Sequence, residues 1–570
     1  MLCRLILSFL VVLIVASFPN DAFAQSVSGV SGAQAGRAEQ QVSRRMTSTK
    51  SGQTIDIAAR IAESAPKGAE KNFFVLDHLQ LDGVTAYTQG DLEPIYGPYL
   101  GQKISLADLY IIAAALQQKY LDDGYLLARV SVPKNPVHKG SARLIAHEGY
   151  IRQVSVTGVT NAHTLTTVQG YLGHVAGSRQ ALNTEDLQHA MFLVNDLPGI
   201  NARAHLIPVK DDAEGYDLLI DAGYKPYDAV IGLDNYGTRY IGPYQVSGEL
   251  ALNGLLGQDE RIDIQTVIAP DLHNSPELYY LGLNYQQPIS SRGTILEVFG
   301  NSDYVSPGYN LKPYDAHGRA WHTGLSLLQS FVRSQYANLK AHITFDMRNT
   351  SNWDNAFATQ YDRIRTIRGG MQGDYKDNWL DRAAANAFVL EVSQGLNILN
   401  ATENGNFTSH PAARPDFTKI TAELQRLQNV ADNVDVFFGL NGQWANKPLY
   451  SAEEFGVGGS QYGRGYYFSD ILGDKGIAAK VEVQWNRPSR SQWFDHYQLY
   501  AFLDAGKVWN FNRDIDQPPT GELLSTGVGF RTSLNSNVDM DFTIAQPLNR
   551  DVPAQGNRAP RFLFSMAKKF

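Results

Sequence analysis

The chain has 570 residues, among them 50 glycines, 29 tyrosines and 25 phenylalanines, and a formal net charge of −8 at pH 7. This length leaves room for several domains, and the abundance of glycine and aromatic residues is typical of β proteins. The modest net charge and the absence of a long basic run argue against nucleic acid as a partner.

The first residues have the pattern of a secretory signal peptide. Arg4 precedes an apolar run, Leu5 to Phe18, that is too short to span a bilayer, and Ala22 to Ala24 form an A-x-A-like cleavage site. We therefore expect residues 1–24 to be removed by cleavage between Ala24 and Gln25. A retained membrane anchor is the alternative. The only cysteine lies inside this segment, so the mature protein would have no disulfides.

The segment that follows, residues 25–70, is rich in serine, alanine, glycine and glutamine. Within it, Ala33 to Arg45 contains good helix formers but almost no apolar stripe. A helix that is polar on all sides cannot bury a face in an ordinary core. Two interpretations remain open, a disordered linker and a helix in a water-lined cavity.

The next part of the chain contains a repeat of strands and helices. The first unit, residues 71–149, is predicted to have a main helix capped by Ser105 and Asp108. Its predicted strands are Phe73 to Leu81, Leu126 to Val132 and Ala142 to Glu148. The second unit, residues 150–226, repeats this order with a helix that begins at Thr184. Its predicted strands are Ile151 to Thr157, Ala202 to Val209 and Tyr216 to Ala222.

Residues 227–570 read as strands and turns. The strands alternate an apolar face with a polar one: between positions 341 and 348 the apolar set is Ala341, Ile343, Phe345 and Met347, and the polar set is His342, Thr344, Asp346 and Arg348. Lipid tolerates no unpaired strand edge, so a membrane protein with this pattern must close into a barrel. We expect about 16 strands, each near the 9 to 11 residues that cross a bilayer obliquely.

Two short motifs in this half predict a contact inside the barrel. Residues 463–468 read GRGYYF and residues 502–506 read FLDAG. Asp504 lies on the strand face opposite an all-apolar one, so it points into the lumen, where a carboxylate requires a cationic partner. Arg464 is the candidate, because it lies on a glycine-flanked loop, residues 450–472, that could fold inward.

These motifs resemble the loop motif VRGY/F and the strand motif FxDxG of the two-partner secretion transporters (TpsB type), the hemolysin secretion/activation protein family. The loop motif carries over to Gly463, Arg464, Gly465, Tyr466 and Phe468, and the strand motif to Phe502, Asp504 and Gly506. The chain departs from the family at Gly463, where valine is usual, which concerns the packing of the loop more than the ion pair. The two repeated units resemble polypeptide-transport-associated (POTRA) domains.

The resemblance implies a mainly β fold, with an outer-membrane antiparallel barrel of about 16 strands preceded by two periplasmic α+β POTRA domains and a helix in the lumen. It implies a large secreted partner, an adhesin or cytolysin with an N-terminal secretion domain, that crosses the outer membrane unfolded. The client would bind by β-augmentation at the groove and strand edge of the first POTRA domain, formed by Leu109, Ile112, Leu116, Leu126, Ala128, Val130 and Val132.

The resemblance extends to the last residue of the chain. Phe570 resembles the terminal aromatic residue by which the barrel-assembly machinery recognises outer-membrane barrels. Outer-membrane lipid would then surround the barrel, with the POTRA domains in the periplasm of a Gram-negative bacterium.

Other functions are less compatible with this sequence. A barrel-assembly insertase typically carries more periplasmic domains and lacks the lumen helix, and a passive porin needs no tandem domains. The two units could also be spacers that only hold the barrel. None of the 13 histidines lies in an HExxH motif and no GxSxG motif occurs, so we expect no enzyme, no metal and no cofactor.

Overall fold

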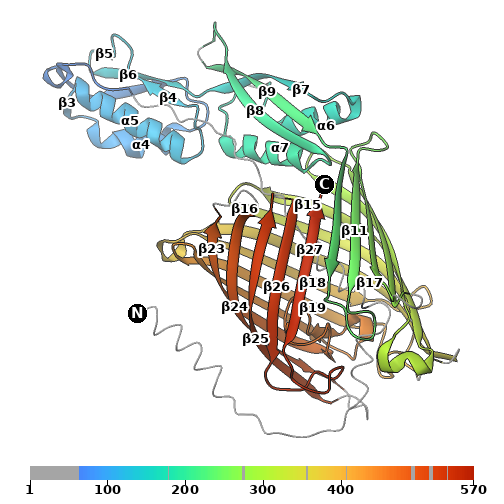
Figure 1. Ribbon diagram of the computed structural model, residues 1–570. Coiled ribbons are helices and arrows are strands. Elements are labelled where there is room, and N and C mark those ends of the chain that lie inside the picture. Colours follow the sequence, from blue (N-terminus) through green and yellow to red (C-terminus); the bar gives the residue numbers. More distant parts are fainter. Residues whose placement is uncertain are drawn as a thin grey trace.

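The computed structural model describes residue 37 and residues 63–177, 179–212, 214–271, 276–354, 357–405, 407–489, 494–511, 518–535 and 537–570. The predicted signal peptide, its cleavage site and all of the predicted helix from Ala33 to Arg45 except Arg37 lie outside the described residues. Figure 1 shows two small α/β units at one end of a single large barrel.

The first unit packs two helices against a small sheet. Its helices are α4 (Gln89–Tyr96) and α5 (Leu106–Asp122), and its strands are β1 (Phe73–Val75), β2 (His78–Asp82), β3 (Lys103–Ser105), β4 (Arg129–Ser131), β5 (Val137–His138) and β6 (Ser141–His147). The sheet has the order β2-β6-β4, β5 also pairs with β6, and β1 pairs with β3. The Ser105 side chain accepts a hydrogen bond from the Asp108 amide at 3.2 Å, so the predicted cap of α5 is confirmed.

The prediction of one strand from Phe73 to Leu81 was wrong. The chain leaves the β1 pairing at Leu76, whose amide donates to the carbonyl of Gln102 at 3.0 Å, and the next amide, of Asp77, donates to Gly140 at 2.8 Å. The two halves of this stretch therefore pair with different strands, because β1 bonds to β3 and β2 bonds to β6.

The second unit has the same plan. Its elements are β7 (Tyr150–Thr157), α6 (Ala162–Leu172), α7 (Thr184–Asp196), β8 (Ile200–Pro208) and β9 (Gly215–Tyr224), with the strands in the order β7-β9-β8. Leu187, Met191 and Val194 of α7 are buried, as the helical spacing predicts. The cap of α7 is Asn183, whose side chain accepts from the amide of Glu185 at 2.8 Å.

The rest of the chain is a closed barrel of 16 antiparallel strands, which confirms the predicted fold class. The strands are β10 (Tyr227–Asp234), β11 (Gln245–Asn253), β12 (Arg261–Ala269), β13 (Leu278–Pro288), β14 (Thr294–Val305), β15 (His317–Arg333), β16 (Ala337–Asp354), β17 (Phe357–Asp377), β18 (Ala384–Gly395), β19 (Thr418–Ala431), β20 (Val434–Ala445), β23 (Lys475–Pro488), β24 (Phe494–Trp509), β25 (Thr520–Leu534), β26 (Val538–Pro547) and β27 (Arg561–Lys569). The barrel closes where β10 pairs with β27.

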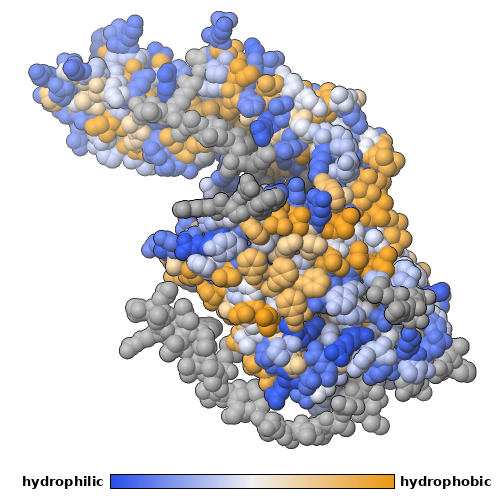
Figure 2. Space-filling model, viewed as in Figure 1, coloured by the Kyte–Doolittle hydropathy of each residue, from blue (hydrophilic) through white to orange (hydrophobic). Residues whose placement is uncertain are grey.

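The expectation of nearly uniform strand lengths was wrong, because β10 has 8 residues whereas β15, β16 and β17 have 17, 18 and 21. Ladder hydrogen bonds also form in water, so a hairpin can continue beyond the hydrocarbon layer. On the face of the barrel that Figure 2 shows, apolar residues cover the middle between more polar ends. Within the described residues, no helix is long and apolar enough to cross a membrane.

The strand faces follow the alternation in the sequence. On β16, Ile343 is 52% exposed on the outside, whereas Asp346 and Arg348 are buried on the inside. The charged face therefore lines the lumen and the apolar face is exposed on the outside of the barrel.

The second unit rests directly on the barrel. Hydroxyls of α6 donate to Asp259 in the turn between β11 and β12, from Thr164 at 2.5 Å and from Thr167 at 2.7 Å. Asp196, at the end of α7, bonds to Arg333 of β15. The chain enters the barrel from this unit at Tyr227. The first barrel strand and every second strand after it therefore run away from the end that carries the two α/β units.

Candidate functional site

The connection from β20 to β23 folds into the barrel. It contains η5 (Ser451–Glu453) and a short hairpin, β21 (Phe455–Val457) paired with β22 (Ile471–Gly473). Side chains of this loop share one buried cluster with residues from distant strands of the wall, among them Val267 of β12, Tyr280 of β13 and Val508 of β24. We call residues 446–474 the lumen loop. It leaves the barrel wall at the end away from the two α/β units and returns into the interior.

Arg464 of the lumen loop meets Asp504 of β24. The guanidinium donates from Nε to Oδ2 at 3.0 Å and from Nη2 to Oδ1 at 2.9 Å, and both side chains are buried. The amides of Gly463 and Arg464 also donate to Oδ2, at 3.2 and 3.0 Å. Four donors therefore converge on one carboxylate that has no exposed surface.

Two charged residues that the sequence analysis missed complete this site. Glu482 of β23 accepts from Arg464 Nη1 at 2.6 Å and from Arg531 Nη1 of β25 at 2.5 Å. The guanidinium of Arg464 also lies 3.4 Å from the centre of the Phe502 ring. Glu482 could have been found from sequence, since it lies on the polar face of a strand that alternates strictly from position 479 to 486.

The glycines of the two motifs allow the lumen loop to approach the barrel wall closely. A Cβ at Gly506 would lie 2.4 Å from Val457 of β21, and a Cβ at Gly465 would lie 2.8 Å from Ser525 of β25. Gly463, where the family usually has valine, has a φ of +97°, a conformation that favours glycine. The departure from the motif therefore suits the backbone conformation that this loop adopts.

The aromatic residues of the loop motif fix its far end. Tyr466 is fully buried, and its hydroxyl donates to Asn549 Oδ1 at 2.9 Å. Its carbonyl accepts from the guanidinium of Arg561 on β27, which lies 3.9 Å from the centre of the Tyr467 ring. Phe468 is also buried. The motif thus contacts β23, β24 and β27 of the barrel wall.

Arg37 is the one described residue of the predicted lumen helix, and it is buried against the lumen loop. Its guanidinium donates to the carbonyl of Ser451, to Ser469 Oγ at 3.2 Å and to the carbonyl of Glu454 at 3.5 Å. The carbonyl acceptors belong to the first residue of η5 and to the residue that follows η5, so Arg37 is bonded to the loop inside the barrel.

The predicted client groove does not have the open lining that we expected. Five of its residues, Leu109, Ile112, Leu116, Ala128 and Val130, are buried in the core of the first unit, and only Leu126 and Val132 are partly exposed. The physical reason is that the apolar stripe of α5 is the same stripe that packs α5 on the sheet. Any docking there must use the strand backbone and the rim.

The free edge of β4 is partly occupied within the protein. β4 pairs with β6 on one side, and the amide of Val130 donates away from β6 to the Gln117 side chain of α5 at 3.2 Å. A client strand at this edge would have to displace or bypass that side chain.

The junction between the two units is built around a buried carboxylate. Glu148 accepts from the amides of Thr85 and Ala86, at 2.8 and 3.0 Å, and from the hydroxyl of Tyr120 at 2.6 Å. Burial and this hydrogen bond raise the pKa of Tyr120 far above its ordinary value. The next residue, Gly149, has a φ of +72°, and a Cβ there would lie 2.6 Å from Leu127. Both units therefore join through a fixed turn.

The C-terminal residue lies at the seam of the barrel. Phe570 is 52% exposed, its amide donates to the carbonyl of Ala229 at 2.9 Å, and Lys225 bonds to its carbonyl at 3.2 Å. Elsewhere in the described part of the chain, no group of three or more His, Cys, Asp or Glu residues could hold a metal ion.

A closed 16-stranded barrel with an apolar belt, a loop folded inward on a buried ion pair and two α/β units at one end define an outer-membrane transporter with periplasmic domains. Residues 219–532 match the family of the haemolysin secretion/activation protein ShlB/FhaC/HecB, and residues 74–149 match the ShlB-type POTRA domain. The chain belongs to this family, which is made up of transporters of two-partner secretion. The protein lies in the outer membrane with its POTRA domains in the periplasm.

Curated relatives agree with this assignment. The heme/hemopexin transporter protein HuxB of Haemophilus influenzae is 23% identical over 530 residues, which span 91% of either chain. The outer membrane transporter CdiB of Escherichia coli is 23% identical over 84% of this chain and 80% of its own length. The solved structure of Escherichia coli CdiB matches 96% of this chain and all of its own with a TM-score of 0.75 at 17% identity, and shows the same fold. CdiB of Acinetobacter baumannii has a TM-score of 0.65.

Proposed function

We propose that this transporter recognises one large exoprotein in the periplasm through its POTRA domains and passes it unfolded to the cell surface. The observation that carries this proposal is the lumen loop, which is bonded to the inner wall by Arg464 and Asp504. A passive porin does not need such a loop. A transporter that opens only when a client engages it does, because a loop that is bonded to the wall at rest can be displaced on demand.

The POTRA domains are the proposed place of engagement. The strands β4 and β8 form one outer edge of each sheet, and each has a helix, α5 or α7, beside it. Backbone at such an edge can bind an extended client segment by β-augmentation. The edge of β8 is the longer, with 9 residues against 3 in β4, and we propose that it contributes more of the backbone hydrogen bonds.

The nature of the client follows from the relatives by analogy. Two of their names attach them to heme and hemopexin and to hemolysin. We propose a client of the same broad class, a large adhesin or cytolysin with an N-terminal secretion domain. We also propose that outer-membrane lipid surrounds the apolar band and that Phe570 serves as the signal for the barrel-assembly machinery.

The remaining domain assignments are part of the same proposal. Residues 1–24 act as the signal peptide, residues 25–70 as the lumen helix and linker, residues 71–149 and 150–226 as the POTRA domains, and residues 227–570 as the barrel. The contacts of Arg37 with the lumen loop support a lumen position for its segment.

The test is export in a Gram-negative host without a transporter of its own. The client to be coexpressed is sought among the products of neighbouring genes, as a very large protein with a β-helical start. Coexpression should move the client to the medium, and removal of residues 71–149 should leave it in the periplasm while the barrel still reaches the outer membrane. General loss of outer-membrane proteins, with unchanged client export, would instead favour an insertase.

A further inference from the structure

A second buried carboxylate joins the lumen loop to the barrel wall. Glu453 is the last residue of η5 and is 2% exposed. Its contacts lie on β16, β17 and β19, whereas those of Arg464 lie on β23 and β24. The lumen loop is therefore attached to two separate parts of the wall, through a negative charge at one end and a positive charge at the other.

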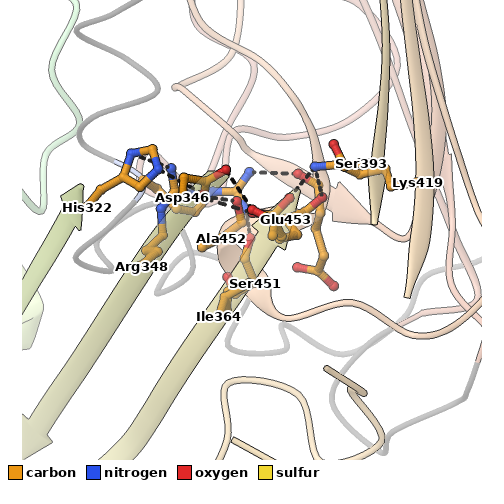
Figure 3. Close-up of polar contacts among 12 residues, drawn as sticks. His322, Asp346, Arg348, Ile364, Ser393, Lys419, Ser451, Ala452 and Glu453 are labelled. Atoms are coloured by element: carbon orange, nitrogen blue, oxygen red, sulfur yellow. Dashed lines mark hydrogen bonds and ion pairs between the residues drawn. The ribbon is translucent and has the colours of Figure 1, made fainter. Parts of the chain in front are cut away.

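Three cationic side chains of the wall surround Glu453, as Figure 3 shows in part. Arg368 of β17 approaches Oε1 with Nη2 at 2.8 Å, Lys419 of β19 bonds to Oε2, and Arg348 Nη1 of β16 is 4.0 Å from Oε1. The backbone is held as well, because Gln443 of β20 donates to the Glu453 carbonyl at 3.0 Å and Arg348 to the Ala452 carbonyl at 3.2 Å.

The wall by itself carries an excess of positive charge. Arg368 is also bonded to Asp346 of β16 at 2.7 Å and lies 3.7 Å from Glu391 of β18. The three cations therefore face two carboxylates of the wall, which leaves one positive charge for the loop to neutralise. His322 of β15 also contacts this group, since its Nδ1 lies 3.4 Å from Arg348 Nη2 and its Nε2 lies 3.1 Å from Asp346 Oδ1.

We propose that Glu453 is a second anchor of the lumen loop, and that Arg348, Arg368 and Lys419 form a cationic site that positions the loop at rest. The inference rests on the proposed transport function, because the loop must leave this site before a client can pass. A buried cation that loses its partner is strongly disfavoured, so the wall itself resists withdrawal of the loop. Glu453 is a positioning residue: it holds the loop and does not touch the client.

The experiment measures the pore without any client. Purified full-length protein is inserted in planar bilayers, and the open probability of single channels is compared among Glu453→Gln, Glu453→Asp and the unchanged protein. We expect Glu453→Gln to raise the open probability by on the order of tenfold, and Glu453→Asp to restore most of the closed state. The matched control is Glu522→Gln, which removes a carboxylate paired with Lys507 at the barrel rim without touching the loop.

A variant approached from the wall guards against a folding defect. Lys419→Gln removes one cation of the site and should raise the open probability in the same direction as Glu453→Gln, while heat-modifiable migration shows that the barrel is intact. The charge exchange Glu453→Arg with Arg368→Glu should reduce the opening caused by either change alone.

Folded Glu453→Gln and Lys419→Gln barrels that open no more often than the Glu522→Gln control would overturn the proposal. Because no client is present, that result would leave client export untouched as a separate question.

Discussion

Arg333 of β15 holds Asp196, the last residue of α7, through two hydrogen bonds of 2.8 and 2.7 Å. The guanidinium also lies 5.2 Å from the centre of the Phe192 ring, and neither charged side chain is more than 21% exposed. This pair ties the second POTRA domain to the periplasmic end of the barrel, and so restrains the orientation of that domain.

The first prediction concerns this pair. Asp196→Asn should weaken the bidentate contact by about 1 to 3 kcal/mol, because one charged acceptor of two hydrogen bonds is neutralised. We expect faster hydrogen exchange in α7 and reduced client export at unchanged barrel levels. Asp186→Asn, on the first turn of the same helix, is the control. Unchanged exchange in α7 would show that the other contacts with the barrel, such as those of Thr164 and Thr167 with Asp259, are sufficient to hold the domain in place.

The second prediction concerns Arg464 and Asp504. Removing one partner of a buried pair leaves the other uncompensated, at a cost of about 3 to 5 kcal/mol, against roughly 0 to 1 kcal/mol for an exposed pair. Arg464→Ala and Asp504→Ala should each strongly impair export at matched barrel levels, and the double variant should be little worse than either one. Additive defects would mean that the pair does not act as a unit in transport.

The third partner, Glu482, changes how the charge exchange of this pair must be interpreted. Arg464→Asp would place a carboxylate next to Glu482, which already accepts from Arg531. Arg464→Asp with Asp504→Arg should therefore restore export only in part. Adding Glu482→Gln to the exchanged pair should improve the recovery, and export assays of the triple variant check this.

The third prediction concerns the N-terminal segment. If it occupies the pore, deletion of residues 25–50 should raise single-channel conductance and admit bulky antibiotics, because a helix of about 10 Å diameter fills much of such a barrel. Arg37→Ala is the milder test, since it removes the contacts of a single side chain, among them those with Ser469 and with the backbone of residues 451 and 454. It should increase the frequency of opening. Unchanged conductance in the deletion variant would show that the segment is a linker and does not occupy the pore.

The fourth prediction concerns the edge of β4. Val130→Pro removes the β4 amide that donates away from β6, and it also removes apolar packing of the buried side chain. The control is Val130→Ala, which removes apolar packing but keeps the amide. If a client pairs with this edge, export should fall further with proline than with alanine at equal stability of the first POTRA domain. Arg129→Pro should instead weaken the sheet, because neighbouring amides of a strand alternate in direction. Equal export by both Val130 variants would show that the client does not pair with β4, and the edge of β8 would be tested next.

Alternation along the strands was sufficient to predict the barrel. It places Asp346, Glu482 and Asp504 on the polar face without any knowledge of the fold, because side chains of a strand alternate with a period of two. The capping residues Ser105 and Asp108 locate the start of α5 for a similarly local reason. Local reasoning of this kind does not separate a client groove from a core, because an apolar stripe on a helix has the same spacing whether it faces a partner or its own core.

The sequence by itself determined which side chains face the lumen and that Arg464 and Asp504 belong to two short motifs. Only the tertiary structure decided what else meets in the lumen. Glu453 and Arg368 are 85 positions apart, and Arg37 and Ser451 are 414 apart, so no local period relates them. Their contacts depend on strand register around a closed barrel and on a loop that returns inside it, and these are properties of the whole fold rather than of any one segment.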